Sequence, residues 1–139
     1  MDVWKKALGR NARVEDLCDV GRLEWDMRNG KYCLITPCRD EAEYAERTLR
    51  SVTSQSVPPA LWVIVDDGSK DKTPAILAEY ARKYDYIRIM RREDRGCRKL
   101  GGGVIDAFYA GYETINSGDF EYVCKLDLDL DLPRQYFEL

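Results

Sequence analysis

Short apolar runs alternate with longer amphipathic segments along this chain, and that alternation constrains its fold more than any other feature. The run YCLIT covers residues 32–36, and the run LWVIVDD covers residues 61–67. Such short, continuously apolar runs are typical of strands buried on both faces of a parallel sheet. Two further strands are expected near residues 86–90 and 122–126.

The segments between these strands carry apolar residues at helical spacing. A first helix is predicted from four apolar residues that recur every three or four positions, namely Ala42, Ala45, Leu49 and Val52. A second should begin at Thr73 and Pro74, where threonine can cap and proline fits the first turn. A third is expected over residues 104–115. This strand and helix order predicts an α/β fold, with right-handed crossovers and helices on both faces of a parallel sheet.

Length and composition favour one folded domain with an N-terminal extension. The 139 residues are 45% hydrophobic and 34% charged, a balance that is typical of a core-forming protein. Residues 1–30 carry a looser apolar pattern and are expected to form a short helical extension, which leaves residues 31–139 as the main domain. The sequence lacks an apolar run of the roughly 18 residues that span a bilayer and lacks a secretory signal, so a cytoplasmic chain is expected.

Charge and residue content exclude several classes of function. A formal net charge of −3 gives no electrostatic support for nucleic-acid binding. Histidine is absent, which excludes Ser-His and Cys-His nucleophiles and every histidine-ligated metal. The cysteines are odd in number and form no CxxC pair, so reduced, packed thiols are expected at Cys18, Cys33, Cys38, Cys97 and Cys124.

Polar or flexible residues follow every predicted strand. The four segments read TPCRDE, DDGSKD, RREDRGCRKLGGG and DLDLD. Parallel strands bring their carboxyl ends to one edge of a sheet, and ligands of such sheets bind there. We therefore expect the four segments to line a single cleft.

The acidic segment after the last strand is a candidate metal site. Asp127 and Asp129 lie on the same face of an extended chain, and paired carboxylates suit Mg²⁺ or Mn²⁺. A solvent-facing strand end explains them equally well, and Asp131 is either a third ligand or surface. A calcium loop also fits the spacing of these residues with Glu138, but Leu132 stands where that loop needs glycine.

Two further segments each have a functional and a structural interpretation. Asp66 and Asp67 can bind a base or ribose, or form an Asx-turn into Gly68, and we expect one carboxylate for each role. A glycine run before the third helix can hold an anion with help from two cations, or act as a hinge; it comprises Gly101, Gly102 and Gly103, after Arg98 and Lys99. A dinucleotide-binding GxGxxG site is disfavoured by the position and spacing of these glycines.

Four blocks of this sequence resemble family-2 glycosyltransferases with the GT-A fold. They read ITPCRDE, TLRSVTSQ, VIVDDGSKDKT and KLDLDLDLP, and the resemblance covers residues 31–139. It implies a Rossmann-like parallel sheet that binds a nucleotide diphosphate sugar with Mg²⁺ or Mn²⁺. It also implies a hexosyltransferase-like enzyme that transfers the sugar with inversion to a saccharide, lipid or protein acceptor.

The resemblance also implies roles for individual residues. Thr36, Pro37 and Glu41 should lie against the nucleotide, with Asp67 facing the base and Asp66 supporting the turn. Further along the chain, Asp127 should approach the ribose or metal. Asp129 should be the direct metal ligand, in a site where the metal bridges the diphosphate.

The sequence departs from this family pattern at two places. DRGCRKLGGGVIDAF replaces the usual asparagine-glycine segment and its alanine-asparagine helix, so the phosphate contacts there differ. The chain also ends about where the acceptor-binding half begins in the family, and that half supplies the general base of inverting relatives. No catalytic residue is assigned, and we expect little or no sugar transfer by this chain alone.

The end of the sequence carries two more expectations. A helix should begin after Pro133, with core-seeking residues Tyr136, Phe137 and Leu139 that lack partners. The last strand should form an exposed sheet edge that favours self-association. Peripheral membrane association is left open, and the main alternative function is a non-catalytic nucleotide-binding or interaction module derived from this fold. A phosphatase or nucleotidyl-transfer enzyme would leave DDGSKDKT unexplained.

Overall fold

The computed structural model describes residues 32–93 and 102–138. The predicted N-terminal extension lies outside the described residues, as do the candidate site residues Arg98, Lys99 and Gly101.

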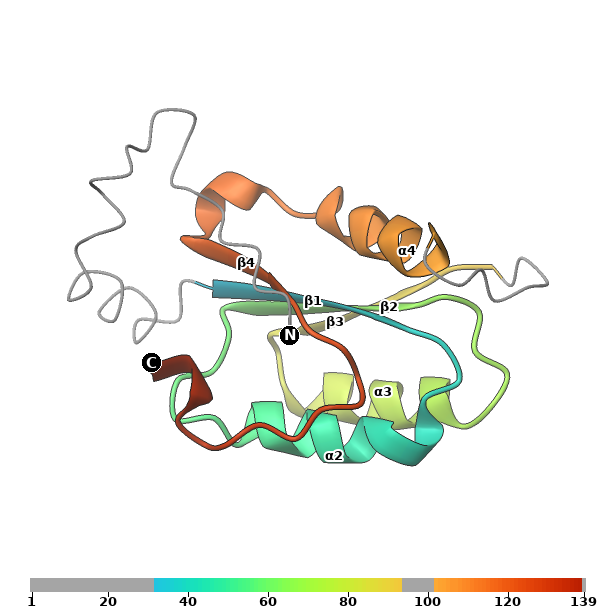
Figure 1. The fold of residues 1–139 in the computed structure, drawn as a ribbon, viewed down its shortest axis with the longest axis horizontal. Coiled ribbons are helices and arrows are strands. Elements are labelled where there is room, and N and C mark those ends of the chain that lie inside the picture. Colours follow the sequence, from blue (N-terminus) through green and yellow to red (C-terminus); the bar gives the residue numbers. More distant parts are fainter. Residues whose placement is uncertain (1–31, 94–101, 139) are drawn as a thin grey trace.

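Four parallel strands form one sheet in the order β3-β2-β1-β4 (Figure 1). Their bounds are Tyr32–Cys38 for β1, Leu61–Asp66 for β2, Ile87–Arg91 for β3 and Tyr122–Lys125 for β4. The four predicted strands are confirmed, with ends that move by one or two residues. Among the described residues β4 is an edge of the sheet.

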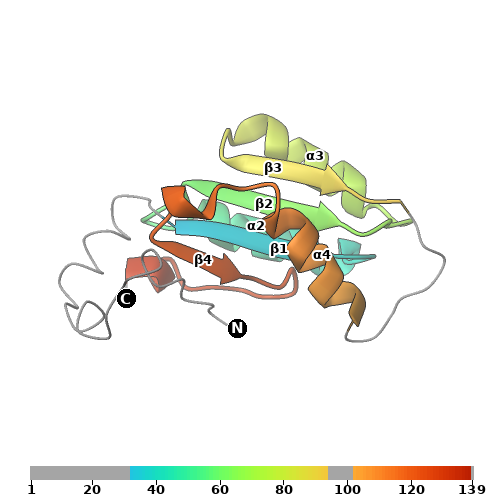
Figure 2. The ribbon, with the colours of Figure 1, turned by 90° about the horizontal axis from the view of Figure 1, so that it is seen from above.

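Helices cover both faces of this sheet, as predicted. α2 (Ala42–Thr53) and α3 (Thr73–Lys83) lie on one face, and α4 (Gly102–Tyr112) lies on the other (Figures 1 and 2). The predicted third helix therefore begins two residues earlier and ends three residues earlier than expected. The described residues also form two single-turn 3-10 helices, η2 (Ser117–Asp119) and η3 (Tyr136–Glu138).

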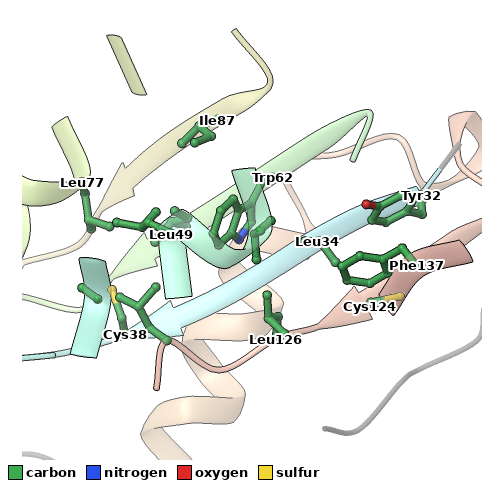
Figure 3. Close-up of a cluster of buried hydrophobic side chains, with 14 of the residues drawn as sticks. Tyr32, Leu34, Cys38, Leu49, Trp62, Leu77, Ile87, Cys124, Leu126 and Phe137 are labelled. Carbon is green, nitrogen blue, oxygen red and sulfur yellow. The ribbon is translucent and has the colours of Figure 1, made fainter. Parts of the chain in front are cut away.

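Alternate residues of the central strands supply two separate cores. Tyr32 and Leu34 of β1 pack with Trp62 and Leu49 in the larger core, between the sheet and α2 and α3 (Figure 3). Residues one position along each strand face the smaller core beneath α4, made of Cys33, Ile35, Val63, Val65, Ala107 and Val123. This two-sided burial explains why residues 32–35 of β1 and residues 61–65 of β2 are apolar without interruption.

The helix α4 approaches the sheet closely at Gly111. A Cβ atom added there would lie 2.8 Å from a methyl carbon of Val65 and 3.0 Å from one of Ile35. Real Cβ atoms do not approach other carbons so closely, so glycine sets the distance between this helix and the sheet.

The segment after β4 crosses α2 and returns to the start of β1 (Figure 1). The Thr48 hydroxyl donates to the carbonyl of Leu130 at 2.6 Å, and the Gln55 amide donates to the carbonyl of Pro133 at 2.7 Å. At its end, Phe137 is only 3% exposed and stacks on Tyr32 with ring centroids 4.5 Å apart. We call residues 126–138 the C-terminal strap.

The strap corrects two sequence-based expectations. The helix predicted after Pro133 is only the single turn η3, because hydrogen bonds from Thr48 of α2 and from Gln55 hold the preceding residues in an irregular path. Phe137 and Tyr136 were expected to lack partners, which is wrong: Phe137 stacks on Tyr32 within the larger core (Figure 3), and Tyr136 packs against the same core. Leu139 lies outside the described residues.

The described cysteines are buried, free thiols, as expected for Cys33, Cys38 and Cys124. Burial raises the pKa of Cys33 to about 12 and that of Cys124 to about 11, so both stay protonated at neutral pH. Within residues 32–93 and 102–138, no helix combines the length and the apolar character needed to cross a membrane.

Candidate functional site

A cleft of about 290 Å³ opens at the carboxyl edge of the sheet. The ends of β1, β2 and β4 line it together with the first turns of α4: Pro37, Cys38, Arg39, Glu41, Asp67, Gly103, Val104, Ala107, Lys125, Asp127, Leu128 and Asp129. All four polar segments that follow strands therefore contribute to one cleft, the third of them through Gly103. The same segment carries Arg92, whose guanidinium lies 3.4 Å from the Asp67 carboxylate.

The two aspartates at the end of β2 have different environments. Asp66 is 1% exposed, and its carboxylate accepts a hydrogen bond from the Ser69 N–H, three residues further on, at 2.9 Å, so it stabilises the turn although not as the expected Asx-turn. Gly68 within that turn has a φ of 80°, which favours glycine. Asp67 instead lines the cleft, and its N–H donates to the Cys38 carbonyl at 2.9 Å. One carboxylate thus shapes the turn while the other faces the cleft.

Hydrogen bonds join the loop after β1 to the loop after β2. Asp40 adopts a left-handed conformation with φ of 52°, in which its N–H donates to the Ser69 hydroxyl at 2.9 Å. Its carboxylate accepts from the Lys70 N–H at 2.8 Å, and Asp71 accepts from the Ala42 N–H at 3.1 Å. These bonds fix the two loops that carry Glu41 and Asp67 relative to each other.

The start of α3 differs in one detail from the sequence prediction. The Thr73 hydroxyl was expected to cap this helix, but it accepts a hydrogen bond from the Glu41 N–H at 3.0 Å. Lys72 stands at the N-cap position without a side-chain cap, and the Asp71 carboxylate accepts from the Thr73 N–H, the first of the helix, at 2.8 Å. The hydrogen bond to the Thr73 hydroxyl links Glu41 directly to the second loop.

The acidic segment after β4 holds an internal cation. The Lys125 ammonium donates to the Asp127 carboxylate at 2.5 Å, and both side chains line the cleft beside Asp129. The Asp129 side chain is exposed, while its carbonyl accepts from Arg47 of α2 at 3.2 Å. The side chains of Leu126 and Leu128 alternate with these charges and enter the larger core.

The carboxylates of the acidic segment after β4 suit a metal ion that is also coordinated by a phosphate ligand. Among residues 32–93 and 102–138, no three acidic or thiol side chains gather closely enough to enclose a metal ion. This arrangement gives no support to the calcium loop or to Asp131 as a third ligand. Mg²⁺ and Mn²⁺ are often held by one or two carboxylates together with substrate phosphates, which is what Asp127 and Asp129 could offer.

Other predicted site residues are placed as follows. Pro37 and Glu41 line the cleft. Thr36 points to the opposite face of the sheet, where its fully buried hydroxyl accepts from the Trp62 indole N–H at 2.8 Å. Gly102 begins α4, and its neighbour Gly103 lines the cleft.

Sequence reasoning missed three polar side chains that line the cleft. They are Cys38, Arg39 and Lys125. Lys125 could have been found, because it lies two residues before Asp127 and a strand presents alternate residues on one face. Burial, reinforced by the nearby carboxylates of Asp66 and Glu41, raises the pKa of Cys38, so it stays a neutral thiol.

Comparison with known proteins identifies relatives of this arrangement. The glycosyl transferase family 2 model matches residues 33–138. A poly-β-1,6-N-acetyl-D-glucosamine synthase of Staphylococcus epidermidis is 32% identical over 95 residues. Those residues are 68% of this chain but only 21% of that protein, so the chain spans about a fifth of that relative's length.

Two solved structures share the fold. TarS of S. aureus in complex with UDP-GlcNAc has a TM-score of 0.55 and 24% identity, covering 71% of this chain and 26% of that one. The mannosyltransferase PcManGT of Pyrobaculum calidifontis, in complex with GDP-Man and Mn²⁺, has a TM-score of 0.56 and 21% identity. That match covers 74% of this chain and 28% of the mannosyltransferase. The GT-A fold implied by the sequence blocks is confirmed, and this chain belongs to glycosyl transferase family 2.

Proposed function

We propose that the cleft binds a nucleotide diphosphate sugar together with Mg²⁺ or Mn²⁺, as the donor site of an inverting glycosyltransferase. One observation carries this proposal. Asp67, at the end of β2, and the Asp127–Asp129 pair, after β4, are far apart in the sequence but line the same cleft. A nucleotide diphosphate sugar needs both a polar contact for its nucleoside and a site for its charged diphosphate.

Each of these side chains has a role that follows from its position. Asp67 can accept a hydrogen bond from the base or a ribose hydroxyl, while Asp66 keeps the turn in shape from its buried site. Pro37 and Glu41 supply a wall next to Asp67, on a loop that is hydrogen-bonded to the second loop. Asp127 and Asp129 would hold the metal, which stabilises the negative charge of the departing nucleoside diphosphate.

The relatives support this choice of ligand. The two structures with the same fold are complexes with UDP-GlcNAc in one case and with GDP-Man and Mn²⁺ in the other. The S. epidermidis relative is named as a synthase of an N-acetylglucosamine polymer. A uridine or guanosine diphosphate sugar is therefore the donor class that we propose for this cleft.

The proposal concerns the sugar donor and the metal, not the acceptor. We assign no general base, and we propose transfer only for a protein that also presents an acceptor and a base to the cleft. The acceptor class, the cytoplasmic location, peripheral membrane association and self-association stay predictions. A non-catalytic nucleotide-binding module is the alternative, and it predicts the same binding without transfer.

Isothermal titration calorimetry tests the donor site directly. UDP, GDP, UDP-GlcNAc and GDP-mannose are titrated into the chain with Mn²⁺ and again with excess EDTA. We expect at least one of them to bind with Mn²⁺ and to lose most of its affinity in EDTA, because the diphosphate and the carboxylates repel each other without a bridging cation.

A matched pair of variants locates the metal ligands. Asp129→Asn removes a charge inside the cleft, whereas Asp131→Asn removes one from the same segment at an exposed position that does not line the cleft. Only the first should weaken Mn²⁺-dependent binding, by about tenfold or more. Equal affinity in EDTA, or equal effects of the two variants, would contradict the metal site.

A further inference from the structure

The ion pair between Lys125 and Asp127 occupies the carboxylate that the proposed function assigns to the metal. The Lys125 side chain is 18% exposed and that of Asp127 is 50% exposed, with 2.5 Å between ammonium and carboxylate. Lys125 is held on β4, which pairs with β1 through the register of Ile35 opposite Lys125. Strand pairing therefore fixes the Cα atom of Lys125, while its flexible four-carbon side chain leaves the ammonium free to move.

A cation bound to Asp127 and the Lys125 ammonium cannot both sit against the same carboxylate oxygen without strong repulsion. Two like charges a few ångströms apart in a partly buried cleft repel by several times the thermal energy. Lys125 must therefore release that oxygen before Asp127 can serve as a full metal ligand. Without a new partner, the ammonium would be left partly buried and unpaired, which costs free energy.

A diphosphate in the same cleft would offer that partner. Of the other described cations near the cleft, Arg39 donates to the Asp67 carbonyl at 3.3 Å, and Arg92 lies 3.4 Å from the Asp67 carboxylate. Both are engaged beside Asp67, which follows β2, and Arg47 is engaged on the Asp129 carbonyl at 3.2 Å. Lys125 lies on the other side of the cleft, next to Asp127 and Asp129, where the proposed function places the phosphates.

We propose that Lys125 is a donor-binding residue that couples metal binding to donor binding. Before the donor binds, its ammonium neutralises Asp127 and weakens the binding of the bare metal ion. When the nucleoside diphosphate enters with the metal, the ammonium leaves Asp127 and binds a phosphate oxygen. The metal and the diphosphate then each raise the affinity of the other, and the coupling is reciprocal. This inference rests on the proposed donor site.

The test compares wild type with Lys125→Met, Lys125→Arg and Lys83→Met. Lys83 is a matched control, because it also pairs with a carboxylate, Glu79 at 2.9 Å, but on the exposed face of α3. For each protein, calorimetry gives the Kd of Mn²⁺ alone, and of UDP with saturating Mn²⁺. Thermal unfolding confirms that each variant is folded.

We expect Lys125→Met to bind Mn²⁺ alone about three- to tenfold more tightly and UDP with Mn²⁺ about tenfold or more weakly. Lys125→Arg should recover part of the UDP affinity, and Lys83→Met should match wild type in both. If the ion pair were purely structural, Lys125→Met would change the melting temperature, and the ratio of its affinity for Mn²⁺ alone to its affinity for UDP with Mn²⁺ would equal that of wild type.

The outcomes separate this inference from the proposed function. If wild type binds UDP with Mn²⁺ and the ratio of the two affinities in Lys125→Met stays within twofold of wild type, the role of Lys125 is overturned while the donor site stands. If wild type binds no nucleotide, the donor site fails. In that case an unchanged Mn²⁺ affinity in Lys125→Met would also overturn the competition at Asp127.

Discussion

Replacement of Phe137 by alanine should unfold the C-terminal strap and lower the stability of the whole domain. Phe137 is 3% exposed and stacks on Tyr32, whose side chain is fully buried. Removing a buried phenylalanine side chain costs about 3 to 5 kcal/mol, and the ring stacking adds about 0.5 to 1.5 kcal/mol. Because the strap can detach locally, the loss is limited by the free energy that anchors it, so about 3 kcal/mol is expected.

Phe137→Ala should also weaken ligand binding at the proposed donor site. The strap begins with Asp127 and Asp129, and its backbone is held to α2 by Arg47 and Thr48. If Phe137 no longer holds the far end, these residues become more mobile, and nucleotide binding in Mn²⁺ should weaken about three- to tenfold. That range corresponds to about 0.7 to 1.4 kcal/mol of lost preorganisation.

Urea unfolding followed by circular dichroism measures the first effect, and calorimetry with UDP and Mn²⁺ measures the second. Phe137→Leu keeps an apolar side chain and should lose only about 1 to 1.5 kcal/mol. Tyr44→Ala, at a side chain that is 39% exposed, should stay within about 0.5 kcal/mol of wild type. A Phe137→Ala protein as stable as Tyr44→Ala would refute the packing of the strap against β1.

Three further substitutions or conditions test other parts of the structure. Asp67→Ala should weaken nucleotide binding about tenfold, measured by calorimetry, with little change in melting temperature. Asp66→Ala should instead cost about 1 to 3 kcal/mol of stability, because it leaves the buried N–H of Ser69 without its acceptor. The opposite pattern in calorimetry and thermal melts would mean that the two roles are exchanged. Gly111→Ala should destabilise by about 1 to 3 kcal/mol in urea, since its Cβ would lie 2.8 Å from a methyl carbon of β2, and a neutral result would mean that α4 shifts without cost. The thiols of Cys33 and Cys124 have folded pKa values raised to about 12 and about 11 from 9.0, so the unfolded state loses their protons first. Stability should hold below pH 9 and fall above it, by up to about 1.4 kcal/mol per thiol and pH unit, and replacing both with alanine should flatten the fall between pH 8 and 10.

The sequence predicts the sheet well because burial on both faces leaves a plain signal. Residues 32–35 of β1 and residues 61–65 of β2 are all apolar, and Gly68 marks where the connection after β2 begins. Parallel topology then brings the ends of β1, β2 and β4 to one edge without any further information. The placement of Asp67 and Asp127 in one cleft follows from that topology.

The remaining features depend on contacts that no periodic pattern encodes. Thr36 stands in a motif expected against the nucleotide, yet its side chain faces the larger core, because a strand alternates its faces and Pro37 takes the cleft side. The path of the strap is set by single hydrogen bonds from Thr48 and Gln55 to carbonyl groups. Carbonyl groups are present at every residue, so the sequence does not mark which of them will be used.

Paramagnetic broadening by Mn²⁺ tests the central claim most directly, because it reports where the metal binds. The ¹⁵N-labelled chain is titrated with Mn²⁺ with and without saturating UDP, and Mg²⁺ serves as the diamagnetic reference in each case. Amide signals of Asp127, Asp129 and Gly103 should broaden first, while those of Leu61 and Ile87, at the amino ends of their strands, should broaden last. Broadening that begins at the amino ends of the strands, or that does not depend on UDP, would contradict a donor site at the carboxyl edge of this sheet.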